Sequence, residues 1–254
     1  MKVISIMNLK GGVGKTITAI NMAAILAANH NKRVLVIDAD PQANASRFFG
    51  ANDASSTLTS LFNGCATHTD DVLWQTQLSG VDVVPADMGL VEIDINTAAN
   101  GENSAKVIPG FVGALREDDE YDFVIIDCPP GFTAVSVSAI AASDDIVIPA
   151  KVDAFALSGI AELKAQIDAV RQLRDNIRIA GVLITLWRPL PVVIQGEQYL
   201  RSSGLPVFET YIRRTDGKVD ESTFTRQSLS DYSPFCNAAR DYRSFVEEYL
   251  RGCE

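Results

Sequence analysis

Short apolar runs alternate along the chain with longer stretches in which apolar residues recur every three or four positions. Runs rich in valine and isoleucine predict buried strands, and the three-to-four spacing predicts helices that turn one face to a core. The predicted strands cover residues 1–7, 33–37, 81–85, 121–127, 145–149, 177–186 and 205–208. The predicted helices cover residues 17–27, 58–62, 72–74, 88–95, 107–115, 157–173, 192–200 and 237–250, whereas the polar stretch 96–104 predicts a loop.

Strands that alternate with helices from end to end predict an α/β fold, in which a mostly parallel, twisted sheet is flanked by helices on both faces. The C-terminal stretch 237–250 has a mixed polar face, with Asp241 and Glu248 beside Arg240 and Arg243. A helix that binds anionic lipid carries a mainly basic polar face. We therefore expect this helix to pack on the sheet.

The junction between the first strand and the first helix reads Asn8-Leu-Lys-Gly-Gly-Val-Gly-Lys-Thr16. Its glycines let successive backbone N–H groups point inward, and the helix N-terminus adds its positive end. Strand, glycine-rich turn and helix is the arrangement that a phosphate-binding loop requires. Lys15 would reach the β- and γ-phosphates of a nucleotide, and the Thr16 hydroxyl would ligate Mg²⁺.

This loop departs from the usual phosphate-loop pattern, because Leu9 stands where that pattern has glycine and Lys10 adds a second lysine. The alternative interpretation is a glycine-rich turn with two incidental lysines. A seven-residue match between a predicted strand and a predicted helix favours the phosphate loop.

Carboxylates follow two of the predicted strands. Asp38 and Asp40 come directly after residues 33–37, and Asp127 ends the apolar run 121–127. The carboxyl ends of parallel strands are where α/β sheets place ligand chemistry, although a polar turn would look similar. Asp127 would hold Mg²⁺ beside Thr16, as the aspartate of a Walker B strand does. Cys128 has no histidine nearby in sequence, so we expect a packing residue and not a nucleophile.

The composition is that of an ordinary globular chain of 254 residues, 47% hydrophobic and 21% charged. No apolar run reaches the roughly 18–20 residues that a membrane span needs, and the N-terminus lacks the layout of a signal peptide. Four scattered cysteines without a Cys-x-x-Cys pair disfavour a zinc or iron–sulfur site. We therefore expect a protein of the reducing cytoplasm.

The net charge of −10 argues against a protein that coats DNA over its whole surface. The charge is unevenly distributed, however, and residues 171–226 contain nine lysines and arginines against six acidic residues. A cationic surface is expected there, the alternative being a solvated face with no partner. The candidates for DNA contact are Arg171, Arg174, Arg188, Arg201, Arg213, Arg214 and Arg226.

The three motifs together resemble the ParA/Soj family of partitioning ATPases, in the deviant Walker A (MinD/ParA) class of P-loop proteins. The resemblance rests on residues 10–16, 38–44 and 127–131, in that order, and extends to 84–86, 148–150 and 155–159. It implies a slow Mg-ATP-dependent ATPase that forms a sandwich homodimer with ATP and binds DNA without sequence preference. It also implies a ParB-like centromere-binding partner and association with the nucleoid.

The resemblance also implies a role for each motif residue. Lys10 is the signature lysine that contacts nucleotide across the dimer, Lys15 binds the phosphates, and Asp40 orients the attacking water. These three form the catalytic group. Thr16, Asp38 and Asp127 serve Mg²⁺. The nucleotide is bound by Lys10, Gly11, Gly12, Val13, Gly14, Lys15, Thr16 and Ile17.

We expect one P-loop ATPase domain over residues 1–254, with no N-terminal helix-turn-helix, because the phosphate loop begins within ten residues of Met1. Residues 211–218 match only loosely the family's Pro-Arg-Asn-type run near the base, so the adenine pocket is not assigned. A MinD-like ATPase that cycles on membranes and a switch that positions another cargo remain alternatives. The cysteines do not resemble the cluster pattern of the nitrogenase iron protein.

Overall fold

The sheet is the centre of the molecule. The computed structural model describes residues 1–66, 68–100, 104–153, 156–172, 174 and 176–253. Within these residues eight strands form one sheet in the order β3-β4-β2-β5-β1-β6-β7-β8. They are β1 (Lys2–Ile6), β2 (Val34–Asp38), β3 (Trp74–Gln75), β4 (Val81–Val84), β5 (Phe123–Asp127), β6 (Asp145–Lys151), β7 (Arg178–Trp187) and β8 (Val207–Arg213). Only the β3–β4 pair among them is antiparallel, so the predicted mostly parallel sheet is confirmed.

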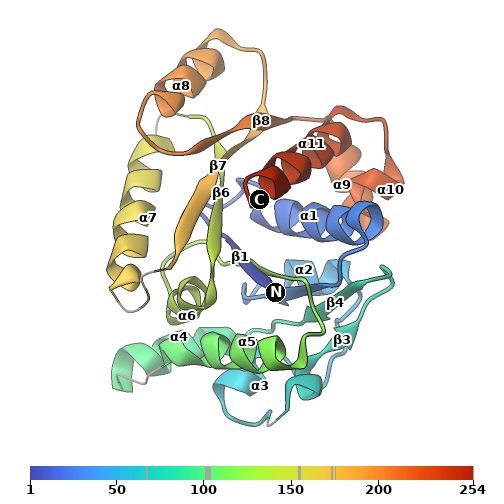
Figure 1. Cartoon of the computed structure of the whole chain (residues 1–254), viewed down its shortest axis with the longest axis vertical. Coiled ribbons are helices and arrows are strands. Elements are labelled where there is room, and N and C mark those ends of the chain that lie inside the picture. The colour runs from blue at the N-terminus through green and yellow to red at the C-terminus, as the bar shows by residue number, and fades with distance from the viewer. Residues whose placement is uncertain (67, 101–103, 154–155, 173, 175, 254) are drawn as a thin grey trace.

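Helices cover both faces of this sheet, as predicted (Figure 1). One layer contains α1 (Lys15–His30), α2 (Asn44–Phe48) and α11 (Asn237–Arg251). The other contains α4 (Gly89–Asn100), α5 (Val107–Asp118), α6 (Ala134–Ala142) and α7 (Ala156–Arg171). Successive side chains of a strand point to opposite faces of the sheet, and this decides which layer of helices each one packs against. Val3 packs with the second layer, and its neighbour Ile4 packs with the first. The remaining α-helices of the described residues are α3 (Leu58–Phe62), α8 (Pro191–Arg201), α9 (Lys218–Phe224) and α10 (Leu229–Tyr232).

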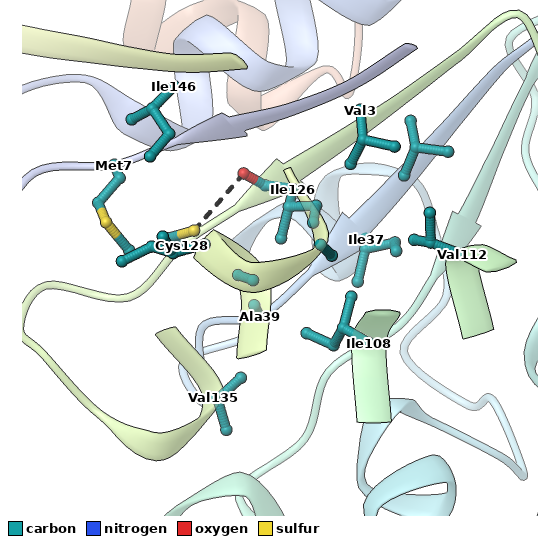
Figure 2. Packing of buried hydrophobic residues seen from close by; sticks show 14 of the residues in the cluster. Val3, Met7, Ile37, Ala39, Ile108, Val112, Ile126, Cys128, Val135 and Ile146 are labelled. Carbon is teal, nitrogen blue, oxygen red and sulfur yellow. Dashed lines mark hydrogen bonds between the residues drawn. The ribbon is translucent and has the colours of Figure 1, made fainter. Parts of the chain in front are cut away.

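The core beneath α5 and α6 extends to the end of β5 (Figure 2). Met7, Ile126 and Cys128 lie in it, and each is fully buried. Burial raises the pKa of the Cys128 thiol to about 12, with the charge of Asp127 acting in the same direction. Cys128 is therefore a protonated packing residue at neutral pH, as predicted.

The C-terminal helix α11 packs on the sheet, which confirms that prediction. Tyr242, Phe245, Val246 and Tyr249 on its apolar face are buried against α1 and the strands. Among the described residues, no helix is long and apolar enough to cross a membrane.

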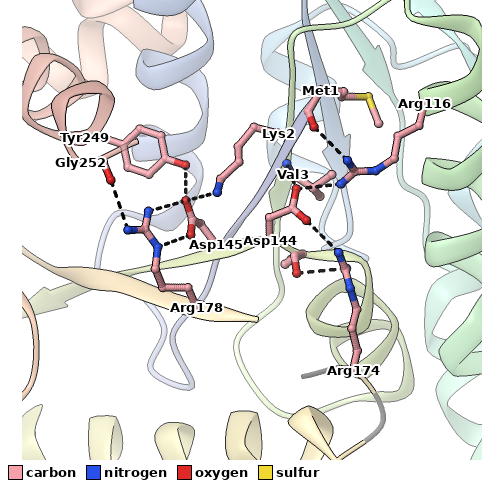
Figure 3. Close-up of polar contacts among 11 residues, drawn as sticks. Met1, Lys2, Val3, Arg116, Asp144, Asp145, Arg174, Arg178, Tyr249 and Gly252 are labelled. Carbon is pink, nitrogen blue, oxygen red and sulfur yellow. Dashed lines mark hydrogen bonds and ion pairs between the residues drawn. The ribbon is translucent and has the colours of Figure 1, made fainter. Parts of the chain in front are cut away.

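Ionic contacts hold together the edge of the sheet opposite the phosphate loop (Figure 3). The buried carboxylate of Asp145 accepts hydrogen bonds from Arg178 (2.7 Å) and the Tyr249 hydroxyl (2.7 Å), and its Oδ2 lies 3.1 Å from Lys2 Nζ. Burial alone would raise the pKa of Asp145, but these bonds outweigh it and leave that pKa lowered. The network joins β1, β6, β7 and α11.

Some local predictions were wrong. Residues 96–100 continue helix α4, since the two alanines within them favour helix and nothing there ends it, while 101–103 of the predicted loop lie outside the described residues. The predicted helix at 72–74 is a 3₁₀ turn, η1 (Thr69–Val72), followed by Trp74 in β3, which pairs with Val83. The last strand runs to Arg213 because its pairing with β7 continues to Trp187. Leu173, predicted on the buried face of 157–173, lies outside the described residues.

Other elements were not predicted. They are α2, α6, α9, α10 and a second 3₁₀ turn, η2 (Ser104–Lys106).

Candidate nucleotide-binding site

The glycine-rich loop lies at the carboxyl end of β1, between the ends of β5 and β6. Gly12 and Gly14 adopt left-handed backbone conformations, with φ of 72° and 86°, which side chains with a Cβ rarely adopt. A Cβ added at Gly11, Gly12 or Gly14 would meet nothing within 4 Å, so the loop presents bare backbone to open space. Helix α1 starts immediately after Gly14 and directs its positive end to the same place.

Neighbouring strands hold the loop in place. The Asn8 side chain, only 5% exposed, donates to the Pro149 carbonyl of β6 (2.7 Å) and accepts from the backbone N–H of Lys10 (2.9 Å). The Thr185 hydroxyl of β7 donates to the carbonyl of Val13 (2.8 Å). The Thr185 contact was not predictable from the sequence, because Thr185 lies 172 positions from its partner and no local pattern marks it.

A cavity of about 610 Å³ opens over the loop. Lys15 lies in its wall, 7% exposed, and its ammonium donates to the Lys10 carbonyl (3.1 Å). Burial lowers the pKa of Lys15, and the negative charge of Asp127 opposes that shift. The other lining residues are Gly11, Gly12, Gly14, Thr16, Ile17, Ile20, Asp40, Gln42, Asn44, Arg47, Phe48, Pro130, Thr223 and Arg226.

The predicted carboxylates lie at the carboxyl ends of β2 and β5, and Asp40 among them lines this cavity. Asp38 and Asp127 are direct neighbours in the register of β2 and β5. Asp38 Oδ2 accepts from both the backbone N–H (2.8 Å) and the hydroxyl (2.7 Å) of Ser46, and Oδ1 accepts from the Asp40 N–H (3.2 Å). Burial raises the pKa of Asp38 to about 6, although the bonds from Ser46 act against it.

Asp127 is the residue that a cation would satisfy. Both of its carboxylate oxygens are buried, and neither accepts a well-formed hydrogen bond from any described residue. Burial, and then the negative charge of Asp38, raise the pKa of Asp127 well above its usual value, and the nearby Thr16 hydroxyl offsets this only in part. Such an unsatisfied carboxylate beside a hydroxyl is a donor set suited to Mg²⁺, which prefers oxygen ligands. The residues present therefore fit a Mg-nucleotide.

The remaining motif residues occupy different positions. Asp40 is buried at the cavity wall, where its Oδ1 accepts from the Gln42 N–H (2.9 Å). Val13 points into the core, so it offers only its backbone to a ligand. Ile17 also lines a second cavity of about 340 Å³, which shares Gly14 with the first. Lys10 lies on the outer side of the loop, 42% exposed, and contacts Asp153 of its own chain.

Four of the seven arginines predicted to bind DNA are engaged by acidic residues of the same chain. Arg171 pairs with Asp168, Arg174 with Asp144, Arg201 with Glu197 and Arg213 with Asp241. Arg226 lines the nucleotide cavity. Most of the excess positive charge in 171–226 is therefore neutralised by acidic side chains of the same chain. A count of charged residues in the segment could not show this.

Arg188 and Arg214 are engaged much less. Among the acidic residues that the structure describes, both approach only Asp216, at 3.5 and 3.8 Å, and that aspartate is itself 90% exposed. They lie side by side, since the Arg214 N–H donates to the carbonyl of Trp187 (3.0 Å). Trp187 stacks on Tyr211 with ring centroids 4.3 Å apart. This packing fixes the end of β7 from which Arg188 projects.

Comparison with known proteins gives concordant results. A family profile described as an AAA domain matches residues 1–179. The chain is 38% identical to a chromosome partitioning protein ParA of Caulobacter vibrioides over 98% of this chain and 94% of that one. It is 34% identical to the chromosome-partitioning ATPase Soj of Thermus thermophilus, over 97% and 94%. A variant of McdA from Cyanothece in complex with ATP superimposes with a TM-score of 0.86 at 26% identity, over 99% of this chain and 96% of that one.

Proposed function

This chain belongs to the ParA/Soj family of deviant Walker A P-loop ATPases, and from that membership we propose that it forms an ATP-dependent homodimer that binds DNA non-specifically and responds to a ParB-like partner. Its cofactors are ATP and Mg²⁺. The observation that carries the proposal is the open glycine loop, with Lys15 in the cavity wall and the unsatisfied carboxylate of Asp127 acting on Lys15 from behind it. We also propose that residues 1–254 act as one ATPase domain built on the single sheet.

The site supports phosphoryl transfer to water by positioning and charge neutralisation, so no covalent nucleophile is required. Lys15 and the loop N–H groups would hold the phosphates, and Thr16 and Asp127 would hold Mg²⁺, with Asp38 behind them. Mg²⁺ supplies neutralisation of the phosphate charge when bound. Asp40 lines the cavity, and it would accept a hydrogen bond from the attacking water. The second cavity, which continues from Gly14, would receive the nucleoside.

Lys10 is proposed to act on the nucleotide of the partner subunit. Its ammonium lies on the outer, half-exposed side of the loop, whereas that of Lys15 is buried against the loop itself. We expect Lys10→Ala to bind ADP with an affinity within about threefold of the wild type, because Lys15 and the loop N–H groups remain. The same variant is expected to stay monomeric with a slowly hydrolysed ATP analogue, as measured by light scattering.

Lys164→Ala is the matched control, since it removes another exposed lysine that is paired with an aspartate. It should dimerise like the wild type. A Lys10→Ala chain that dimerises as well as this control would rule out the role across subunits.

The proposed DNA-binding surface is centred on Arg188 and Arg214. They are the weakly paired, adjacent cations in the basic segment, and they lie at the ends of β7 and β8, on the same edge of the sheet as the phosphate loop. A dimer formed across that edge would bring two such pairs together. A monomer of net charge −10 has little electrostatic attraction for DNA. The dimer would present twice as many of these arginines on one face, and because the dimer needs ATP, DNA binding would depend on ATP. In the cell this predicts association with the nucleoid.

We expect Arg188→Gln/Arg214→Gln to reduce DNA affinity of the ATP-bound dimer by at least about tenfold at low salt. Each lost phosphate contact should also make the log–log salt dependence shallower by about 0.9. Fluorescence anisotropy over a salt series, with ATP, with ADP and without nucleotide, measures both quantities.

Lys32→Gln/Arg33→Gln removes the same charge at the opposite edge of the sheet and should leave DNA binding nearly unchanged. Equal losses in the two double variants would show that only net charge matters. If the wild-type ATP-bound dimer does not bind DNA at low salt, the proposed partitioning role is refuted. A membrane-cycling or cargo-positioning ATPase then becomes the better explanation.

A further inference from the structure

The ammonium of Lys10 contacts the carboxylate of Asp153 within the same chain. Lys10 belongs to the loop after β1, and Asp153 follows β6, the strand that pairs with β1. Asn8 fixes the backbone of Lys10 to β6 through its bonds to the Lys10 N–H and the Pro149 carbonyl. The contact is therefore built from two adjacent strand ends that are tied together, and it is not a chance meeting of long side chains from separate elements.

This contact competes with the proposed role of Lys10. One ammonium cannot fully neutralise a carboxylate of its own chain and the phosphates of a partner's nucleotide at the same time. We propose that Asp153 is a positioning residue that holds Lys10 in its own subunit before ATP binds, and so opposes dimerisation until the partner's nucleotide displaces it. This inference rests on the proposed ATP-dependent dimer.

The strength of the contact suits an equilibrium that ATP can reverse. The side chains are 42% and 27% exposed, so solvent screens the ion pair. Exposed pairs of this kind shift an equilibrium by about 1.4- to fivefold each. Because a symmetric dimer would break two of them, the combined effect on dimer affinity is about two- to 25-fold. Because a triphosphate carries several negative charges, the partner's ATP can displace the single carboxylate of Asp153 from the Lys10 ammonium.

Asp153 could also have the opposite role and favour dimerisation. The two roles predict changes of opposite sign in dimer affinity when Asp153 is removed. If Asp153 instead aims Lys10 at the partner, its removal weakens the ATP-bound dimer. If it restrains Lys10, its removal strengthens that dimer. The direction of the change in dimer affinity therefore decides between them.

The test compares Asp153→Asn with Asp168→Asn. The second variant removes an equally charged, ion-paired aspartate from α7, the next helix, without affecting Lys10. Analytical ultracentrifugation with a slowly hydrolysed ATP analogue measures dimer affinity. The rate of acetylation of Lys10 in the nucleotide-free chain, followed by mass spectrometry, measures directly whether its amine is held.

We expect Asp153→Asn to dimerise about two- to 25-fold more tightly and to acetylate faster at Lys10, with Asp168→Asn unchanged in both. Asp153→Glu, which keeps the carboxylate, should restore slow acetylation. In a Lys10→Ala background, Asp153→Asn should have no further effect on association. Weaker dimerisation of Asp153→Asn, or an unchanged acetylation rate, would overturn the inference. A wild-type chain that stays monomeric with the analogue would instead overturn the dimer proposal, while the acetylation result would still decide whether Asp153 holds Lys10.

Discussion

Lys15→Ala is expected to weaken binding of Mg-ATP by about 100-fold or more. The Lys15 ammonium would make charge-assisted hydrogen bonds to two phosphates, each contributing about 1.5–3 kcal/mol, which together correspond to a factor of about 100 to 10⁴. Its loss also removes a positive charge that acts on Asp127 and Asp40, so these carboxylates would repel a triphosphate more strongly. Isothermal titration calorimetry with ATP and with ADP measures the effect.

A loss of fold is not the expected cause. Burial lowers the pKa of Lys15, which means that the charged lysine is held at a cost in the nucleotide-free chain. Removing it should leave the thermal unfolding midpoint unchanged or slightly higher. Lys164→Ala serves as the control for nucleotide binding, because it removes a lysine that does not line the cavity. ATP affinity like that of the wild type in Lys15→Ala would refute the assignment of the phosphate loop.

Elements with a local signal were predictable from the sequence. β2 and β5 are continuous apolar runs that are buried along their whole length, and α7 and α11 show a clear helical spacing. The phosphate loop was found because glycine and lysine occur there in a pattern that only this local conformation requires. Asp127 was predictable because it ends a continuous apolar strand.

Elements that depend on tertiary contacts were not predictable. Helix α2 has only five residues, and it is held by Ser46, whose side chain bonds to Asp38 and to the Ala86 N–H. Helix α6 is apolar on all sides because it is buried between the sheet and α5, so it shows no amphipathic spacing. Contacts such as Thr185 to Val13 join segments far apart in sequence, and a single sequence carries no record of them.

Surface charge was the least predictable property. The excess of basic residues in 171–226 suggested a broad cationic face, but acidic partners come from other segments, as Asp144 does for Arg174 and Asp241 for Arg213. Only the folded chain shows which arginines are available. The proposed DNA surface is accordingly much smaller than the segment 171–226.

The second large effect is expected for Asp40→Ala, which should lower the turnover number by about 10²- to 10⁴-fold, the range for loss of a positioned proton acceptor. Asp40 is buried in the wall of the cavity that contains Lys15 and Thr16, and its carboxylate is anchored by the Gln42 N–H at 2.9 Å. The phosphate cradle does not depend on it, so ATP affinity should change by less than about threefold. Because the dimer would separate only after hydrolysis, the variant should accumulate as an ATP-bound dimer.

Asp40→Asn separates chemistry from loop geometry. Its amide oxygen can still accept from the Gln42 N–H, which keeps the loop in place, but a neutral amide cannot take a proton from water. We therefore expect steady-state ATPase assays to show a similar loss of turnover in both variants, and light scattering to show persistent dimers in both. If Asp40→Asn keeps most of the wild-type turnover while Asp40→Ala loses it, Asp40 only supports the loop. If both variants keep it, the residue that orients the water must be sought elsewhere, beginning with Asp38, which lies two positions away and bonds to the Asp40 backbone.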